Sequence, residues 1–342
     1  MNVSPPLPIT NAQSLIDELQ QRGVSTCFVQ WIKPSGELVG CWVPLTHLAS
    51  AIADGVYIEK SMLAKYSGET EVKTLRADIT SSRVFGCLDG YAHLVADSWD
   101  KIEPNKECGR LALKSYLNRL KRGFPDLNIH VERRATVFFR ATEMQTNGTS
   151  RLYNTSAAND YLPLFRARDF LSRLHEWLVF VGFDVSQIEH CAGGLFIIQY
   201  LGNDVLEAAD NWVRFRLLAN HIADDLNVEC ETGIGHSLDL SPSPITLSIR
   251  SADNTPLLTY KDELTTKGQS FVAGIIEKVE HLAEIQHIAL GSFKRQFPLF
   301  QVTAQGLQWN MINGSANPYW VLLEILQAGI EGIEQNKALN LE

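Results

Sequence analysis

The segment SANPYWVLLEILQAGIEGI, residues 315–333, decides the fold of this chain. Its apolar residues predict a helix over residues 319–334, and the stretch before it predicts a short strand over residues 306–311. Towards the N-terminus, helix-like and strand-like segments follow one another. Further helices are predicted over residues 111–120, 165–181, 205–226 and 270–290, and further strands over residues 129–140, 188–200 and 245–250. We therefore predict an α+β fold of antiparallel strands with helices packed on one side, rather than a doubly wound sheet.

The first hundred residues predict a separate, smaller unit. Residues 28–44 contain two strand-like runs joined by a Pro34-Ser35-Gly36 turn, which is the pattern of a hairpin. Further strands are predicted over residues 83–96, and a polar stretch over residues 106–109 follows. The length of 342 residues also favours two domains. We predict a boundary between a domain of residues 1–105 and a domain of residues 106–342.

Composition excludes several classes of function. The formal net charge of −9 argues against non-specific nucleic-acid binding, which needs a basic face that displaces counterions. No apolar stretch is long enough to cross a bilayer, so we expect no membrane partner. The N-terminus has neither a basic start nor an apolar run, and the six cysteines are scattered without a CxxC pair. We expect a cytoplasmic protein with free thiols.

Four segments, taken in order, resemble one known family. Residues 316–319 read Ala-Asn-Pro-Tyr, and GSFKR at residues 291–295 precedes them. The segment LEAADNWVRFRLLANHIADDL at residues 206–226 and the hairpin at residues 28–44 come earlier. This series is similar to the glutamine synthetases over about residues 10–335. The resemblance implies a β-grasp-like N-terminal domain followed by a glutamine-synthetase-like catalytic-fold domain. It also implies ring-shaped homo-oligomers, although this chain stops where the family continues.

The family's reaction phosphorylates the glutamate side chain with ATP and displaces the phosphate with ammonia or an amine. Divalent cations held by carboxylates and a histidine neutralise the phosphoryl charge. The family's first Glu-x-Glu pair resembles Glu132-Arg133-Arg134, where Arg134 stands in place of the second carboxylate. Side chains at i and i+2 of a strand share a face, so this replacement reverses the charge of a cation site.

The remaining family positions are mostly replaced as well. In the second metal segment Glu189 matches a carboxylate, whereas Gly194 and Phe196 replace a glutamine and a second carboxylate. Either Pro244 or His236 takes the place of the metal histidine, and we favour Pro244 because the strand after it matches better. Near the C-terminus Gln308, Asn310 and Asn313 stand where the family has charged residues, and the arginine-bearing loop before them is absent.

Glu132, Glu189 and Arg295 survive from the family's site. Arg295 matches the arginine that holds the substrate carboxylate, so Arg295, Arg134, Glu132 and Glu189 are the predicted substrate-binding residues. Glu132 and Glu189 could still hold one weakly bound Mg²⁺. We favour a salt bridge between Glu132 and Arg134 across the old metal pocket, since a buried carboxylate needs a partner.

The leading hypothesis is therefore a non-catalytic glutamine synthetase homologue that binds a small carboxylate, an amino acid or another protein, in a regulatory or assembly role, and needs no cofactor. An alternative is a divergent enzyme that uses ATP with Mg²⁺ or Mn²⁺, in a pocket that would also include Arg133. A third hypothesis is a structural subunit that co-assembles with an active relative. His190 and Cys191 do not predict a nucleophilic pair, because adjacent strand residues face opposite ways.

Overall fold

The computed structural model describes residues 11–58, 73–85, 90–100, 103–140, 161–192, 195–201, 204–232 and 243–340. The chain divides into two compact units, residues 1–112 and residues 113–342. The boundary between the units, after Ala112, falls within helix α4 (Gly109–Gly123). Each unit is described below by itself.

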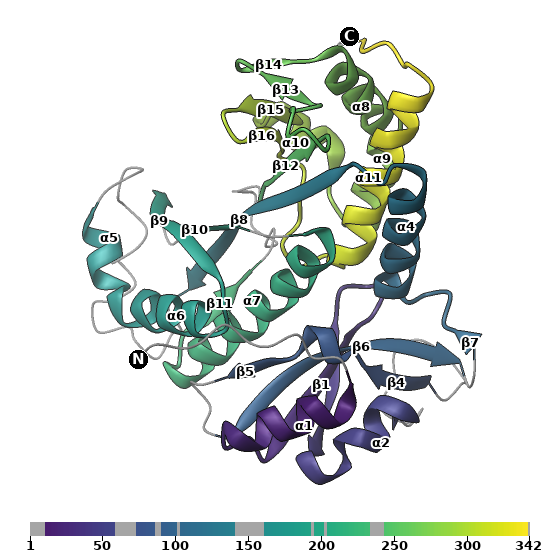
Figure 1. Ribbon diagram of the computed structural model, residues 1–342. Helices are drawn as coiled ribbons and strands as arrows, with labels where there is room; N and C mark the ends of the chain where they lie inside the picture. Colours follow the sequence, from purple (N-terminus) through teal and green to yellow (C-terminus); the bar gives the residue numbers. More distant parts are fainter. Residues whose placement is uncertain are drawn as a thin grey trace. The chain divides into compact units, whose positions relative to one another are not determined.

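In its described residues the first unit is a mixed β-sheet on which helices pack (Figure 1). Its helical elements are α1 (Ala12–Gln21), η1 (Leu45–His47), α2 (Leu48–Ala53) and η2 (Ile79–Ser81). Its strands are β1 (Thr26–Ile32), β2 (Leu38–Pro44), β3 (Val56–Ile58), β4 (Lys73–Ala77), β5 (Arg83–Phe85), β6 (Tyr91–Asp100) and β7 (Glu103–Pro104). The main path of the sheet runs β2-β1-β6-β4-β3, with β5 and β7 also paired to β6.

The predicted hairpin over residues 28–44 corresponds to β1 and β2, which pair antiparallel from Thr26 opposite Pro44 to Ile32 opposite Leu38. The neighbouring pair β1 and β6 is parallel, so the sheet of this unit contains both antiparallel and parallel pairs. The apolar sides of α1 and α2 cover one face of the sheet, where Leu15, Leu48 and Leu94 are fully buried. Burial of such side chains removes apolar surface from water and stabilises the unit.

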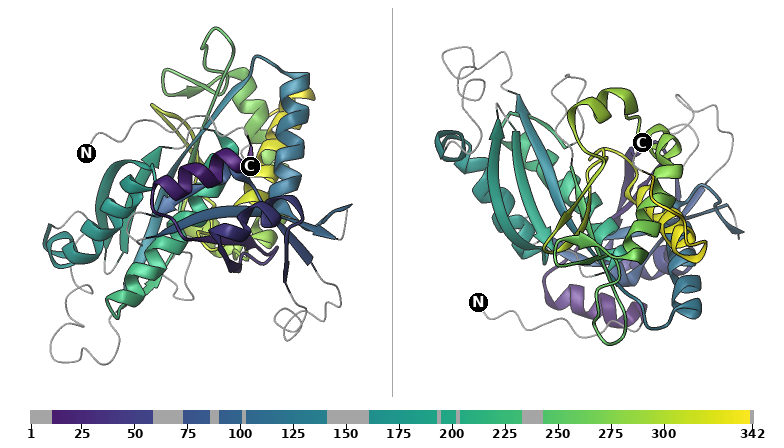
Figure 2. Two further views of the ribbon diagram at one scale, coloured as in Figure 1. Left: turned by 60° about the horizontal axis from the view of Figure 1, so that its bottom comes forward. Right: turned by 90° about the horizontal axis from the view of Figure 1, so that it is seen from above.

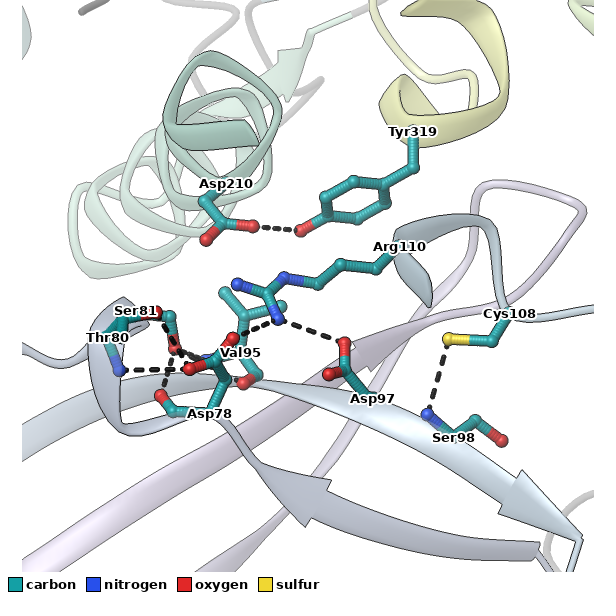
Figure 3. A network of polar contacts seen from close by, with 10 residues as sticks. All are labelled: Asp78, Thr80, Ser81, Val95, Asp97, Ser98, Cys108, Arg110, Asp210 and Tyr319. Carbon is teal, nitrogen blue, oxygen red and sulfur yellow. Dashed lines mark hydrogen bonds and ion pairs between the residues drawn. The ribbon is translucent and has the colours of Figure 1, made fainter. Parts of the chain in front are cut away.

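A buried ion network crosses the first unit beneath α4 (Figure 3). Nη1 of Arg110 donates to Oδ2 of Asp78 at 2.7 Å and to Oδ1 of Asp97 at 2.9 Å. The Arg110 side chain is 1% exposed, and the two carboxylates are 11% and 10% exposed. A charge in such a place is tolerable only when it is paired, so this network holds the start of α4 on the sheet.

The second unit contains a larger sheet surrounded by helices (Figure 1). Besides α4, its helices are α5 (Tyr161–Arg166), α6 (Arg168–Phe180), α7 (Val205–Asp225), α8 (Thr266–Glu277), α9 (Val279–Ile285), α10 (Leu290–Gln296) and α11 (Pro318–Glu334). Its strands are β8 (Asn128–Arg140), β9 (Asp184–Ala192), β10 (Leu195–Leu201), β11 (Glu229–Glu231), β12 (Ile245–Arg250), β13 (Thr259–Tyr260), β14 (Glu263–Leu264), β15 (Phe300–Thr303) and β16 (Gly306–Trp309).

The larger sheet is antiparallel throughout its described pairs. Its order is β15-β16-β12-β8-β10-β9, and β11 pairs with the far end of β8. Figure 2 shows the blue and teal strands β8, β10 and β9 side by side. The antiparallel sheet with packed helices confirms the predicted α+β class. Strand β8 pairs with three other strands, so its side chains lie at the centre of the sheet.

The segment 315–333, with which the sequence analysis began, forms α11. Oδ1 of Asn317 accepts hydrogen bonds from the N–H groups of Tyr319 and Trp320, and Pro318 follows as the first helical residue. This order of residues starts a helix because the cap satisfies its first donors and proline needs none. Tyr319 is fully buried, and its hydroxyl donates to Oδ1 of Asp210 on α7 at 2.6 Å (Figure 3).

Helices α8 and α11 pack closely through glycine (Figure 1). A Cβ atom built on Gly274 would lie 2.0 Å from the Ala328 carbonyl oxygen and 3.0 Å from Cα of Gly332.

We expect Gly274→Ala to lower the free energy of unfolding by about 1–3 kcal/mol, because the added methyl group would force α8 and α11 apart. Urea denaturation followed by circular dichroism measures this. The matched control is Gly123→Ala on α4, whose Cβ would meet no atom within 4 Å and which should cause no loss. Equal stability of wild type and Gly274→Ala would contradict this packing.

Within the described part of the chain, the helices include none that has the length and apolarity of a membrane span.

Candidate functional site

The candidate site is built on one face of the larger sheet, and β8 defines it. Glu132 and Arg134 alternate along β8 with Val131, Arg133 and Ala135. The second set is buried at 3% exposure or less, whereas Glu132 and Arg134 are half-buried. Successive side chains of a strand point to opposite faces, so Glu132 and Arg134 share the more open face.

Strand register brings further polar side chains to this face. Arg134 lies opposite Gln199 of β10, and Gln199 lies opposite Gln187 of β9. Glu189 follows Gln187 by two residues and therefore shares its side of the sheet. On the other side of β8, Thr246 of β12 lies opposite Glu132, and Gln308 of β16 lies opposite Thr246. We call this surface the polar face; it comprises Glu132, Arg134, Gln187, Glu189, Gln199, Thr246 and Gln308.

Each charged group of the polar face contacts a polar partner on the same face. Nη2 of Arg134 forms an ion pair with Oε1 of Glu189, and Nε2 of Gln199 donates to Oε1 of Glu132. Nε2 of Gln187 donates to Oε2 of Glu189 at 3.4 Å. The predicted salt bridge between Arg134 and Glu132 is therefore wrong in its partner. Arg134 of β8 pairs with Glu189 of β9, which lies two strands away. Gln199 of β10 instead donates to Glu132, the carboxylate on the same strand as Arg134.

The β16 end of the polar face carries neutral amides. Nε2 of Gln308 donates to Oδ1 of Asn310 at 2.7 Å, and Nδ2 of Asn310 donates to the Pro298 carbonyl oxygen at 3.0 Å. Gln308 and Asn310 are each only 5% exposed. These are the positions where the resemblance implied charged residues. The amides satisfy each other and add no charge to the face.

Arg133 lies on the opposite face and is not part of the pocket that the alternative hypothesis assigned to it. Its guanidinium carbon lies 3.5 Å from the centre of the Trp212 ring, and its Nη2 donates to Oγ of Ser243 at 3.2 Å. Burial lowers the pKa of Arg133 to about 10. Adjacent residues of a strand face opposite ways, so Arg133 and Arg134 cannot line one pocket and the alternative hypothesis is wrong on this residue.

Arg295 stands apart from the other predicted residues. It lies on α10, is exposed, and donates from Nη2 to Oγ of Ser292 at 3.0 Å. Among the described residues no hydrogen bond or ion pair joins Arg295 to Glu132, Arg134 or Glu189. The structure thus brings together three of the four predicted binding residues.

The second metal segment does not place Phe196 on the polar face. Phe196 lies opposite the buried Val137 of β8 and three residues before Gln199, so strand alternation places it on the buried side, where its ring centre lies 5.4 Å from that of His190. Ile197 lies opposite Glu189 instead. Gly194 and His236 lie outside the described residues. Pro244 is buried, and its carbonyl oxygen accepts from the Arg134 N–H at 3.0 Å.

His190 and Cys191 face opposite ways, in accord with the sequence analysis. His190 is fully buried, whereas Cys191 is half-buried two residues beyond Glu189. Burial and then the negative charge of Glu189 raise the pKa of the Cys191 thiol above its usual value. A thiol in this state is a poor nucleophile, because the thiolate is the reactive form.

The polar face does not have the donor set of a divalent cation site. In the ranges that the structure describes, no three histidine, cysteine, aspartate or glutamate side chains come together as a set of ligands. Oxygen atoms of Glu132 and Glu189 accept from Gln199 and Arg134, and the Arg134 guanidinium reaches past β10 to the Glu189 carboxylate on β9. With both carboxylates engaged and a guanidinium in contact with Glu189, the arrangement as it stands opposes a divalent cation.

Sequence comparison shows which class this fold and site belong to. The family described as glutamine synthetase, catalytic domain, matches residues 107–313, which is more than half of the chain. The chain therefore belongs to the glutamine synthetase family.

Particular relatives refine this assignment. The glutamine synthetase of Halobacterium salinarum is 21% identical over 95% of this chain and 78% of its own length. The glutamate–methylamine ligase of Methyloversatilis universalis is 30% identical over 62% of this chain and 49% of its own length. Among solved structures, GmaS without ligand superposes with a TM-score of 0.84 at 19% identity, covering 96% of this chain and 82% of GmaS. That likeness concerns the fold.

Proposed function

We propose that this protein binds a small carboxylate or amino acid on the polar face and does not catalyse ATP-dependent ligation. The ion pair between Arg134 and Glu189 carries the proposal. A guanidinium group here takes up a carboxylate that a metal ion would need, and it repels a second cation. The same guanidinium is suited to a carboxylate ligand, to which it can present a planar fork of donors.

Charge counting on the polar face supports binding rather than phosphoryl transfer. Glu132 and Glu189 supply two negative charges, and Arg134 supplies one positive charge. Catalysis of phosphoryl transfer depends on positioned cations that stabilise the charge of the transferring group. One arginine already engaged with Glu189, beside the neutral amides Gln308 and Asn310, is a weak arrangement for that task.

The same residues suit a ligand that carries both a carboxylate and an amino group. The Arg134 side chain is 29% exposed and that of Glu189 is 22% exposed, so both remain within reach of solvent. A ligand carboxylate would contact Arg134, and a ligand ammonium would contact Glu189 or Glu132. Gln187 and Gln199 offer amides that orient either group. We propose no cofactor for this binding.

A second candidate function is a divergent amide ligase. The similarity to a glutamate–methylamine ligase favours it, and the fold also matches a structure of a GmaS complex with ADP at a TM-score of 0.83. Under this reading ATP would bind with Mg²⁺ or Mn²⁺, and Glu132 and Glu189 would have to release Gln199 and Arg134 to take part.

We further propose that the protein is a cytoplasmic homo-oligomer of the ring type, or a subunit that co-assembles with an active relative. Its membership of the glutamine synthetase family supports the ring assembly. The negative net charge is consistent with a protein that binds no nucleic acid.

A product assay separates the two functions. We expect the purified full chain, given ATP, Mg²⁺ or Mn²⁺, L-glutamate and either ammonium or methylamine, to release no ADP and form no amide above buffer. We also expect calorimetry without nucleotide to detect L-glutamate or succinate, and Arg134→Gln to weaken that binding about tenfold, because one charge-assisted contact is lost. Arg173→Gln, an exposed arginine of α6, is the control. ADP release coupled to amide formation would establish the ligase instead.

A further inference from the structure

The second unit contains a cavity away from the ion pair of the polar face. It has a volume of about 460 Å³ and lies where the C-terminal half of α4, the start of β8 and the start of α7 meet. This volume falls within the range of small-molecule sites, roughly 300–1,000 Å³. The contributing stretches are residues 114–130 and 204–206.

The walls of the cavity are mainly apolar. Among its lining side chains Leu120 and Val205 are buried, whereas Phe124 is 39% exposed. The other apolar lining residues are Leu117, Pro125, Leu127, Ile129 and Leu206. Apolar side chains that line an open hollow favour a ligand with an apolar body, because its burial would remove both surfaces from water.

The charges at the cavity are mostly positive. Lys114 and Lys121 both line it, and a spacing of seven residues places them on the same side of α4. Asp204 is the one acidic lining residue, and its Oδ1 already accepts from the Glu207 N–H at 2.7 Å as the cap of α7. The positive end of the α7 dipole further offsets this carboxylate. In the described structure Lys121 makes no ion pair, so its ammonium can meet a ligand.

We infer that this cavity binds an organic monocarboxylate with an apolar body. The carboxylate would lie at Lys121 and Lys114, and the apolar body would lie on Leu117, Phe124 and Leu206. The carboxylate would contact the two ammonium groups, and the apolar tail would contact the apolar walls. A polar phosphate ester would leave the apolar walls without a partner, and the lysines would repel a cation. This inference is independent of the proposed function, since none of these side chains belongs to the polar face.

Calorimetric titration of the full chain with octanoate tests the inference. We expect one octanoate per chain and no binding of octylammonium, which has the same tail and the opposite charge. Lys121→Glu should weaken octanoate about tenfold or more, because it replaces a charge-assisted contact by repulsion. Arg122→Glu is the matched control: it makes the same charge change in the same last turn of α4 but lies outside the lining.

Two further variants distinguish a site from general charge effects. Lys121→Arg should bind octanoate with an affinity within about threefold of wild type, since it keeps the positive charge. Leu206→Trp should weaken octanoate by filling the cavity, with circular dichroism to show that the variant is folded. Equal octanoate affinity in Lys121→Glu and Arg122→Glu, equal affinity for octylammonium, or no octanoate binding at millimolar concentration would each overturn the inference.

Discussion

Replacement of Arg110 by methionine should lower the free energy of unfolding by about 3–5 kcal/mol, since it leaves the buried carboxylates of Asp78 and Asp97 without their shared cation. Both carboxylates approach the same guanidinium nitrogen, at 2.7 and 2.9 Å, and all three side chains are largely shielded from water. Methionine keeps most of the side-chain volume, so the loss reports the charge rather than a cavity. Urea denaturation followed by circular dichroism and tryptophan fluorescence measures it.

The control for this prediction is the same substitution at an exposed ion pair of the same unit. Arg22 contacts Glu18 at 2.7 Å, and these side chains are 37% and 25% exposed. Arg22→Met should cost less than about 1 kcal/mol, because water solvates both groups when the pair is broken. If Arg110→Met and Arg22→Met cost the same, the Arg110 network is not the structural anchor described above.

The sequence predicts the elements of this protein better than their ends. The segment over residues 188–200 was predicted as one strand but forms β9 and β10, which turn back on each other. The segment over residues 270–290 was predicted as one helix but contains α8 and α9, which are divided at Lys278. The Gly193-Gly194 pair was a local signal for the first break, whereas apolar residues continue across Lys278, so periodicity alone does not mark the second break.

The composition of the candidate site was predictable in part. The i, i+2 spacing of Glu132 and Arg134 placed both on one face, and family resemblance located Glu189. The choice of partner was not predictable, because it depends on Gln199, a single polar residue in the apolar run LFIIQYL, whose position depends on cross-strand register. For Arg295 the family resemblance predicted a place in the site. Among the described residues, however, Arg295 makes no contact with Glu132, Arg134 or Glu189. The β-grasp character of the first unit stays a prediction.

Replacement of Arg134 by glutamate should create a Mn²⁺ site on the polar face. The substitution changes the charge of Glu132, residue 134 and Glu189 together from −1 to −3. It also releases Glu189 from its ion pair. Even with water-like screening, two unit charges facing a divalent cation at about 4 Å contribute roughly 4 kcal/mol. We therefore expect Mn²⁺ to bind at least about a hundredfold more tightly to Arg134→Glu than to wild type.

Electron paramagnetic resonance of free Mn²⁺ and calorimetry both measure this binding. Arg173→Glu makes the same charge change on the exposed side of α6 and should leave Mn²⁺ affinity within about threefold of wild type, because solvent screens a single surface charge. Arg134→Gln should fall between wild type and Arg134→Glu, since it frees Glu189 without adding a third carboxylate. If wild type already binds Mn²⁺ as tightly as Arg134→Glu, then Arg134 moves aside for a cation. The polar face would then be a metal site, and the ligase reading would take precedence.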